Sequence, residues 1–170
     1  SGLFPSLADN ADVVSVVNAQ HFARVESYVA DAAARGARVV IAGDWPDAAS
    51  VSTRRMPLRI VVNPAPDSEI ARNEIFGPAL VLRTYSDMAQ AVNELNAGER
   101  PLALYYFGTD AAEQAWVLNH TLSGGVSING TSQDYMAPFG GYKQSGNGRE
   151  YADWGIHDFC EVKGIVGWAE

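Results

Sequence analysis

Cysteine is almost absent from this chain, and its scarcity removes several possibilities. The 170 residues include one cysteine, Cys160, so no disulfide can form within the chain. A lone thiol fits a reducing compartment, and we expect a cytoplasmic location. Cys160 lies in a β-like run beside an acidic residue, whereas a catalytic thiol needs a neighbouring base or dipole that stabilises its thiolate. We therefore expect Cys160 to pack against other side chains and not to act as a nucleophile.

Clustered positive charge, long apolar runs and grouped metal ligands are also missing. Lys and Arg number 12 against 20 Asp and Glu, which gives a net charge of −8. This balance disfavours nucleic acid and anionic membranes as partners, because phosphate contacts need clustered basic side chains. No apolar run approaches the length of a membrane span. The three histidines are dispersed along the chain, so no metal site is expected.

Three glycine-containing signatures are absent as well. The chain has no G-x-x-x-x-G-K-[ST] phosphate loop and no G-x-G-x-x-G between a strand and a helix. It also has no G-x-S-x-G nucleophile elbow. The glycine-rich stretch that the chain does contain, near residue 140, is therefore not a nucleotide-binding loop of either kind.

Apolar spacing predicts three helices of substantial length. Residues 18–35 show the period of an amphipathic helix, with Asn18 as its N-cap and Gly36 at its C-terminal end. Its apolar stripe consists of Phe22, Val25, Val29 and Ala32. The other two helices are expected to begin at Ser86 or Asp87 and at Thr109 or Asp110. For the last of them the expected apolar side consists of Ala112, Ala115, Trp116 and Asn119.

Short apolar strands alternate with these helices, which is typical of βαβ units. Strands are expected at 39–41, 58–62, 80–85, 102–107 and 126–128, the first of them buried, with a short helical turn over 67–73. The fold class is therefore α/β, with a mostly parallel sheet and flanking helices. We expect one domain over residues 1–170: an α/β layer (1–128), a loop (129–148), and a tail helix and strand (149–170). The expected tail strand, Phe159 to Trp168, would pair outside the domain and serve in oligomerisation.

Two motifs stand out within this pattern, Glu74–Pro78 and Pro138–Glu150. Taken alone, the first indicates a turn whose Phe76 fills the core, and the second a flexible surface loop. Arg149 and Glu150 would then lie on a solvated face. Asn129, which follows a strand, would cap a turn. These simple interpretations leave the order and spacing of the two motifs unexplained.

Together the two motifs resemble the C-terminal third of an aldehyde dehydrogenase. The resemblance implies that Glu74 accepts hydrogen bonds from the two hydroxyls of the nicotinamide ribose of NAD or NADP, because two carboxylate oxygens match a vicinal diol. It places Phe76 beside the nicotinamide ring. It places Asn129 at the floor of the substrate pocket and Phe139 in its wall, with residues 132–137 as the variable rim of the aldehyde entrance.

The resemblance also assigns roles to the tail. It implies that Arg149 pairs with Glu161 and holds the tail against a neighbouring subunit, in a homo-oligomer that is a dimer or tetramer. It places Glu150 near the catalytic pocket, in a proton path. Residues 100–107 and 123–126 resemble the coniferyl and fatty-aldehyde branch of the family, while the stretch from Tyr142 to Glu150 resembles its larger general branch. The two resemblances leave the substrate class open, with an aromatic or apolar aldehyde favoured by the first.

Parts of the family's machinery have no counterpart in these residues. The nucleophilic cysteine, the base glutamate and the dinucleotide domain would all lie upstream, so we expect no catalytic residue here and no activity from this chain alone. The whole enzyme would oxidise an aldehyde to a carboxylic acid with NAD(P)+. Two alternatives stay open: semialdehyde or acyl-phosphate reduction on the same scaffold, and a non-catalytic assembly module. Fold alone cannot choose between them.

Overall fold

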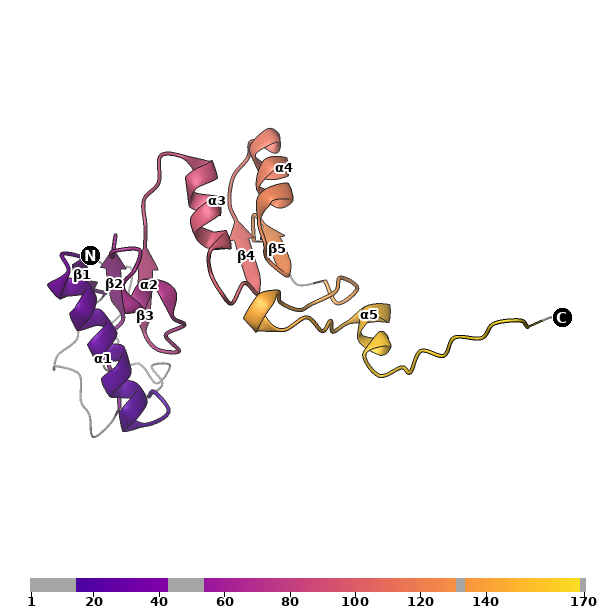
Figure 1. The fold of residues 1–170 in the computed structure, drawn as a ribbon. Coiled ribbons are helices and arrows are strands. Elements are labelled where there is room, and N and C mark those ends of the chain that lie inside the picture. Colours follow the sequence, from indigo (N-terminus) through magenta and orange to yellow (C-terminus); the bar gives the residue numbers. More distant parts are fainter. Residues whose placement is uncertain (1–14, 43–53, 131–133, 169–170) are drawn as a thin grey trace. The chain divides into compact units, whose positions relative to one another are not determined.

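The chain folds as two compact units, one up to Thr84 and the other from Tyr85 onward. A computed structural model describes residues 15–42, 54–130 and 134–168 (Figure 1). The elements expected in one layer, residues 1–128, are thus divided between the two units, and each unit has its own sheet. No helix within the described ranges is both long enough and apolar enough to cross a membrane.

Helix α1 (Ala19–Ala34) organises the first unit, and its predicted features are confirmed. The Asn18 side chain accepts a hydrogen bond from the His21 main-chain N at 2.7 Å, which satisfies one of the free donors at the helix start. Gly36 ends the helix with φ +92°, a conformation that costs glycine little. The four residues of the predicted stripe are buried: Phe22, Val25, Val29 and Ala32.

The sheet of the first unit has the order β1-β2-β3. Strands β1 (Arg38–Ile41) and β2 (Arg59–Val62) are antiparallel, and β2 and β3 (Ala79–Leu82) are parallel. The predicted helical turn is the short helix α2 (Glu69–Arg72). Val61 and Ile70 form one apolar cluster with residues of α1, so the helices cover one face of this sheet.

Strand β1 differs from its prediction, because it is not buried. Val40 is 36% and Ile41 55% exposed. The strand lies at the end of the sheet order and pairs only with β2 among the described residues. A short β-branched run indicates a strand but does not show whether the strand is central or at an edge, and here it is at an edge.

The second unit is built around a parallel pair of strands joined by a helix. Strands β4 (Ala103–Tyr106) and β5 (Gly125–Ile128) are parallel and are connected by α4 (Ala111–His120). Helix α3 (Met88–Asn96) precedes them. The predicted caps are confirmed: the side chain of Asp87 accepts two main-chain hydrogen bonds at the start of α3, and that of Asp110 does the same for α4.

The buried side of α4 was predicted wrongly. Val117 is its buried residue, whereas Ala112, Ala115 and Asn119 are exposed. Apolar residues occupy nearly every side of this helix, so their spacing does not define one face, and contact with the rest of the unit decides which side is covered. Tyr106 on β4 is also buried, and its hydroxyl donates to Glu113 of α4.

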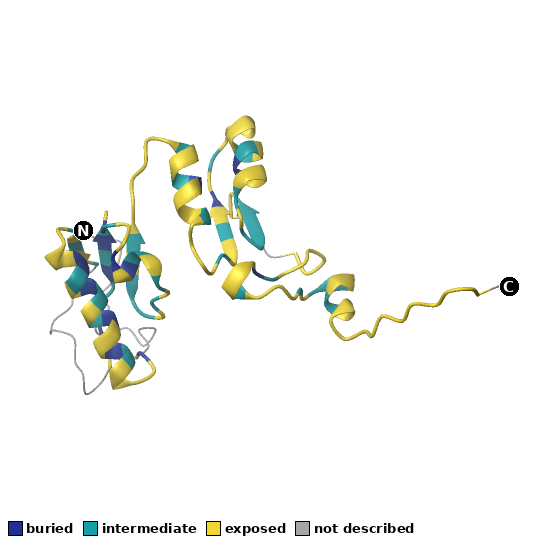
Figure 2. Ribbon diagram, in the orientation of Figure 1, coloured by how far each residue is buried: buried dark blue, intermediate teal, exposed yellow. Residues whose placement is uncertain are grey.

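The C-terminal part contains a 3-10 turn, η1 (Lys143–Ser145), and helix α5 (Ala152–His157). The strand expected over Phe159–Trp168 is absent from the described part of the chain, and residues 156–168 are exposed throughout (Figure 2). Five apolar side chains project without cover from residues 159–168: Phe159, Val162, Ile165, Val166 and Trp168. Cys160 lies among them and is exposed, so the expectation that it packs is also wrong. A strand needs a neighbour for its main-chain groups, and none of the described residues supplies one.

Candidate functional site

The motif Glu74–Pro78 forms a corner immediately before β3 in which side chains alternate between inside and outside. Ile75 packs against both apolar clusters of the first unit. A methyl group on Gly77 would lie 2.9 Å from Val25 Cγ2, so a larger residue has little room there. Glu74 precedes Ile75, and Phe76 lies between Ile75 and Gly77. Both Glu74 and Phe76 are exposed. We call residues 74–77 the carboxylate–aromatic corner.

Phe76 does not fill the core, as the simple interpretation of the motif required. Its side chain is 73% exposed, and its φ of +49° lies in the left-handed region, which costs a residue with a bulky side chain about 1–3 kcal/mol. Strain of this kind is concentrated at ligand and active sites. The carboxylate of Glu74 makes no hydrogen bond or ion pair with any residue that the structure describes. Both side chains therefore remain available to a ligand.

Two residues near the start of α1 hold the main chain of this corner. His21 Nε2 lies 2.7 Å from the carbonyl oxygen of Phe76, and Arg24 Nη2 lies 3.4 Å from that of Ile75. Arg24 Nη2 is also 3.2 Å from His21 Nδ1. Sequence reasoning missed both residues, because a histidine and an arginine on the polar side of an amphipathic helix carry no signal of a contact more than fifty residues away.

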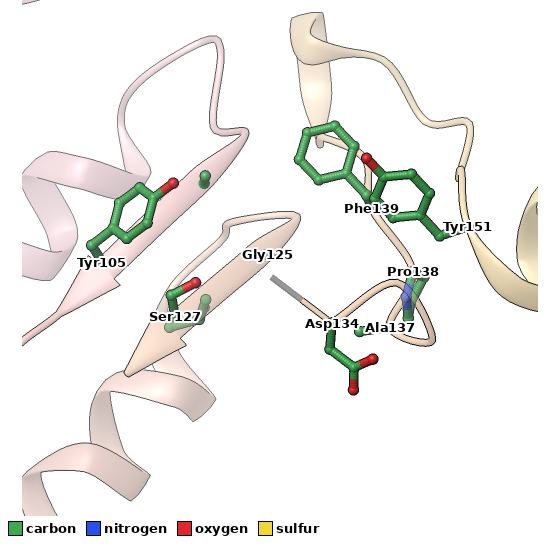
Figure 3. Close-up of a pocket in the computed structure, with 10 residues that line it drawn as sticks. Tyr105, Gly125, Ser127, Asp134, Ala137, Pro138, Phe139 and Tyr151 are labelled. Atoms are coloured by element: carbon green, nitrogen blue, oxygen red, sulfur yellow. The ribbon is translucent and has the colours of Figure 1, made fainter. Parts of the chain in front are cut away.

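The second unit contains a pocket of about 430 Å³, a size suited to a small organic ligand (Figure 3). One wall of the pocket is a face of the β4–β5 pair. On this face Tyr105 lies opposite Ser127, and Ala103 lies opposite Gly125. Because Ala103, Gly125 and Ser127 are small, they leave the pocket open. Because strand side chains alternate, the neighbouring Tyr106 lies on the opposite, covered face.

Aromatic rings form the other side of the pocket. The ring centroids of Phe139 and Tyr151 are 5.7 Å apart, and Tyr135 meets Tyr151 edge-on at 5.2 Å. Figure 3 shows Phe139 and Tyr151 together, across from Tyr105 and Ser127. The resemblance predicted that Phe139 lies in the wall of the substrate pocket. Phe139 lines the pocket described here, and its contact with a substrate stays a prediction. Tyr151 was not predicted, because its place in the wall depends on a φ of +73° that the sequence does not reveal.

Backbone pairing fixes the position of Phe139. Its N–H donates to the carbonyl of Glu150 at 3.0 Å, and the N–H of Glu150 donates back at 2.7 Å. Glu150 thereby joins the two ends of the glycine-rich segment through its main chain. Its side chain is exposed and does not line the pocket, so its role in a proton path stays a prediction.

The glycine-rich segment is tightly folded and not a flexible loop. A methyl group on Gly140 would lie 2.2 Å from the carbonyl oxygen of Gly148, and one on Gly141 would lie 2.3 Å from Ser145 Cβ. Lys143 Nζ donates to two carbonyls at the end of α3, those of Asn96 at 2.5 Å and Gly98 at 2.9 Å. A cation at a helix C-terminus satisfies free carbonyls and opposes the helix dipole.

Arg149 completes this packing instead of pairing with Glu161. Its Nη1 donates to the carbonyls of Gly141 at 2.9 Å, Asn147 at 3.1 Å and Gly148 at 2.8 Å. Its guanidinium lies 5.2 Å from the ring centre of Tyr142. Glu161 is exposed and has no ion-pair partner among the residues described. The structure therefore gives Arg149 a structural role within this chain, while the Arg149–Glu161 pair is not formed.

Asn129 does not line the pocket. Its side-chain oxygen accepts from the N–H of Gly108 at 2.9 Å, and its side-chain nitrogen donates to the Gly108 carbonyl at 2.9 Å. Both halves of the amide are thus used to tie the end of β5 to the end of β4. This geometry matches the simple interpretation of a turn-capping asparagine. Residues 132 and 133 of the predicted rim lie outside the described residues, while Asp134, Ala137 and Pro138 line the pocket.

No group of three or more potential metal ligands occurs in the described ranges. What the two units present is an α/β scaffold with an exposed carboxylate–aromatic corner on one and an aromatic pocket on the other. A pocket with apolar walls and a few polar groups is typical of sites for small organic molecules.

Comparison with known proteins identifies the family. The sequence profile described as the aldehyde dehydrogenase family matches residues 4–165. A relative from Caulobacter vibrioides is 39% identical over 170 residues, which cover 97% of this chain and 35% of the relative. The coniferyl aldehyde dehydrogenase of a Pseudomonas species is 36% identical over 170 residues, 98% of this chain and 35% of that protein. The chain belongs to the aldehyde dehydrogenase family, and it spans about a third of the length of these relatives.

Solved structures agree with this assignment. Aldehyde dehydrogenase C of Pseudomonas syringae, a mutant complexed with NAD+ and octanal, matches with a TM-score of 0.79 at 34% identity over 91% of this chain and 32% of that protein. An aldehyde dehydrogenase of Mycobacterium tuberculosis complexed with NAD+ matches with a TM-score of 0.76 at 28% identity, over 92% of this chain and 33% of that one. The α/β fold class predicted from the sequence is confirmed.

Proposed function

We propose that this chain is part of an NAD(P)+-dependent aldehyde dehydrogenase, which oxidises an aldehyde to a carboxylic acid. The observation that carries the proposal is the carboxylate–aromatic corner. Its carboxylate has no partner among the residues that the structure describes, its ring is exposed, and its main chain is held by Ile75 and His21. Membership of the aldehyde dehydrogenase family supports NAD(P)+ as the ligand of this corner. The chain contributes cofactor positioning and one wall of a substrate pocket, while the covalent chemistry belongs to residues outside it.

The corner suits the nicotinamide riboside half of the cofactor. The two oxygens of Glu74 accept hydrogen bonds from adjacent ribose hydroxyls, and a charged acceptor makes such bonds stronger than a neutral one does. The ring of Phe76 offers a flat apolar surface that limits the swing of the nicotinamide. When bound, NAD(P)+ accepts the hydride that leaves the aldehyde carbon. Solved relatives complexed with NAD+ support this choice of cofactor.

The pocket of the second unit suits an aromatic aldehyde. Phe139 and Tyr151 offer ring faces on one side, and the small residues Ala103 and Gly125 leave space on the other. The hydroxyls of Tyr105 and Ser127 are able to meet a polar substituent on the substrate ring. The name of the Pseudomonas relative, coniferyl aldehyde dehydrogenase, supports the same substrate class.

We test this function with Glu74→Gln in the full-length protein that contains this chain. The glutamine keeps the shape but loses the charge of the acceptor, which removes about 1.5–3 kcal/mol and raises the KM for NAD(P)+ roughly 10- to 100-fold. The KM for the aldehyde is expected to change little. Glu94→Gln, on the exposed surface of α3, is the matched control. An unchanged cofactor KM in Glu74→Gln would refute the assignment.

The exposed tail favours assembly as an additional role. Residues 156–168 carry uncovered apolar side chains, including Phe159 and Trp168, which folded proteins rarely leave in water together. We propose that they meet another part of a homo-oligomer, a dimer or tetramer, and that the protein works in the cytoplasm, where the exposed Cys160 stays reduced. Light scattering of the full-length protein tests the assembly. A monomer at micromolar concentration would contradict it.

A further inference from the structure

The carboxylate–aromatic corner is held in an unusual way, through the main chain and not through its side chains. Phe76 packs against little, since its ring is mostly exposed, and its backbone adopts a left-handed conformation. Its carbonyl oxygen receives the hydrogen bond from His21. His21 is half-buried near the start of α1, a helix whose opposite side is fixed in the core by four apolar residues. The helix thus provides a rigid base from which the peptide of Phe76 is held.

Arg24 and the Phe76 carbonyl together determine which nitrogen of His21 carries the proton. A guanidinium has only donors, so the contact between Arg24 Nη2 and His21 Nδ1 requires Nδ1 to accept. In the neutral ring the hydrogen must then sit on Nε2, where it is donated to the Phe76 carbonyl. The three groups form one directed chain, from Arg24 through His21 to Phe76.

Arg24 is itself held in position by further contacts. Its guanidinium lies 5.8 Å from the ring centre of Tyr28, one turn further along α1, and Nη2 approaches the carbonyl of Ile75 at 3.4 Å. His21 and Arg24, which are three positions apart on α1, therefore bond two consecutive carbonyls of the corner, those of Phe76 and Ile75. The peptides on either side of the Phe76 Cα are held, and this sets the direction of the Phe76 Cα–Cβ bond. Glu74 precedes the held Ile75 peptide by one residue and shares this stretch of main chain.

We propose that His21 is a positioning residue for the cofactor-binding corner and that Arg24 acts through it by favouring, together with the Phe76 carbonyl, its Nε2–H tautomer. The inference rests on the function proposed above. It adds that the affinity for the nicotinamide riboside depends on two side chains of α1 that act through the corner's main chain. A large part of the effect of His21 on cofactor binding is thus expected to depend on Glu74.

The tautomer is tested first, on the 170-residue chain and without reference to any activity. Long-range proton–nitrogen correlation spectra in mildly alkaline buffer report which imidazole nitrogen is protonated. We expect Nε2–H for His21, because both of its contacts select this tautomer. In Arg24→Met, which keeps the stem of the side chain but not its donors, only the Phe76 carbonyl selects the tautomer, and we expect a smaller share of Nε2–H. A predominant Nδ1–H form in the unchanged chain would overturn the proposed chain of hydrogen bonds, and an unchanged share of Nε2–H in Arg24→Met would overturn the part assigned to Arg24.

The positioning role is tested in the full-length protein. His21→Ala is expected to raise the KM for NAD(P)+ about 3- to 10-fold, the effect of losing one neutral hydrogen bond, with the KM for the aldehyde unchanged. His21→Gln, whose amide can donate to the same carbonyl, is expected to recover most of the loss and guards against a folding defect. His120→Ala is the control, since His120 is an exposed histidine stacked on Trp116 in the other unit.

The double variant His21→Ala/Glu74→Gln separates the two proposals. If His21 acts by positioning Glu74, the double variant binds the cofactor about as weakly as Glu74→Gln alone. Full additivity of the two effects, or no recovery in His21→Gln, would overturn the positioning role while leaving the proposed function intact. If Glu74→Gln itself has no effect, the proposed function fails, and the tautomer measurement still decides whether the hydrogen-bond chain exists.

Discussion

Two adjacent glycines at the start of β5 should differ sharply in their tolerance of a methyl group. A methyl group on Gly124 would lie 1.6 Å from the carbonyl oxygen of Gly140, whereas one on Gly125 would meet nothing within 4 Å. Real contacts of this kind begin near 3.0 Å, so the Gly140 carbonyl would have to retreat by about 1.4 Å. Because both glycines have ordinary φ values, the difference between the variants is one of space and not of backbone strain.

Neighbouring residues of the glycine-rich segment prevent the Gly140 carbonyl from moving this far. Gly140 is itself packed against Gly148 and Arg149, so the whole glycine-rich segment must move with it. Overpacking of this kind costs about 1–3 kcal/mol, and we expect Gly124→Ala to lie at the upper end because backbone atoms, not a flexible side chain, are in the way. Gly125→Ala should be neutral or stabilising by about 0.5 kcal/mol, since glycine loses more entropy on folding than alanine does.

Native-state hydrogen exchange measures this difference within the second unit. The amides of β4 and β5 report the stability of the unit, and those of Phe139 and Glu150, which bond to each other's carbonyls, report the attachment of the pocket wall. We expect Gly124→Ala to lower protection at both places by about 2–3 kcal/mol relative to Gly125→Ala. Equal protection in the two variants would show that the glycine-rich segment is loosely packed, and the account of the pocket wall given above would then be wrong.

Two other predictions concern ionisation and activity. The hydrogen bond to Glu113, together with burial, raises the pKa of Tyr106 to about 12. A raised pKa in the folded state means that this contribution to stability is complete below the ordinary tyrosine pKa of about 10 and is lost as the pH rises toward 12. Tyrosinate absorbance should therefore show a late-titrating step that is missing in Tyr106→Phe. The 170-residue chain alone should produce no reduced nicotinamide from NAD(P)+ and an aldehyde, and clear turnover would contradict the assignment of the covalent chemistry to other residues.

Local rules predicted much of the fold, because they depend on neighbours along the chain. The stripe of α1, its Asn18 cap and the caps Asp87 and Asp110 are all confirmed, since a cap and a stripe involve residues only two to four positions apart. The edge position of β1 and the covered side of α4 could not be predicted in this way. They depend on which strand or helix, distant in the sequence, packs against the element. In an alanine-rich helix such as α4, the sequence also gives little indication of which side is buried.

The candidate site was predicted unevenly, for a related physical reason. Glu74, Phe76 and Phe139 were predicted from motifs that resemble a family. The structure leaves Glu74 and Phe76 exposed and Phe139 in a pocket wall, and their roles stay predictions. His21 and Tyr151 were missed. His21 contacts the main-chain carbonyl of Phe76, 55 residues away in the sequence. A pattern of side chains in the sequence does not reveal which residue bonds a main-chain carbonyl. Tyr151 reaches the wall through a backbone conformation that is uncommon for a tyrosine.

The cost of the carboxylate–aromatic corner is itself an argument for its function. An exposed phenylalanine ring gains little from burial, and its left-handed backbone is unfavourable, so Phe76 stabilises this chain neither by packing nor by conformation. Replacing it with glycine would relieve the strain. The fold nevertheless supports this conformation, with Ile75 and Gly77 anchored on each side and a histidine bonded to the carbonyl. A conformation that is disfavoured in the isolated chain but held from three directions is explained most simply by a contact that the chain makes with something else.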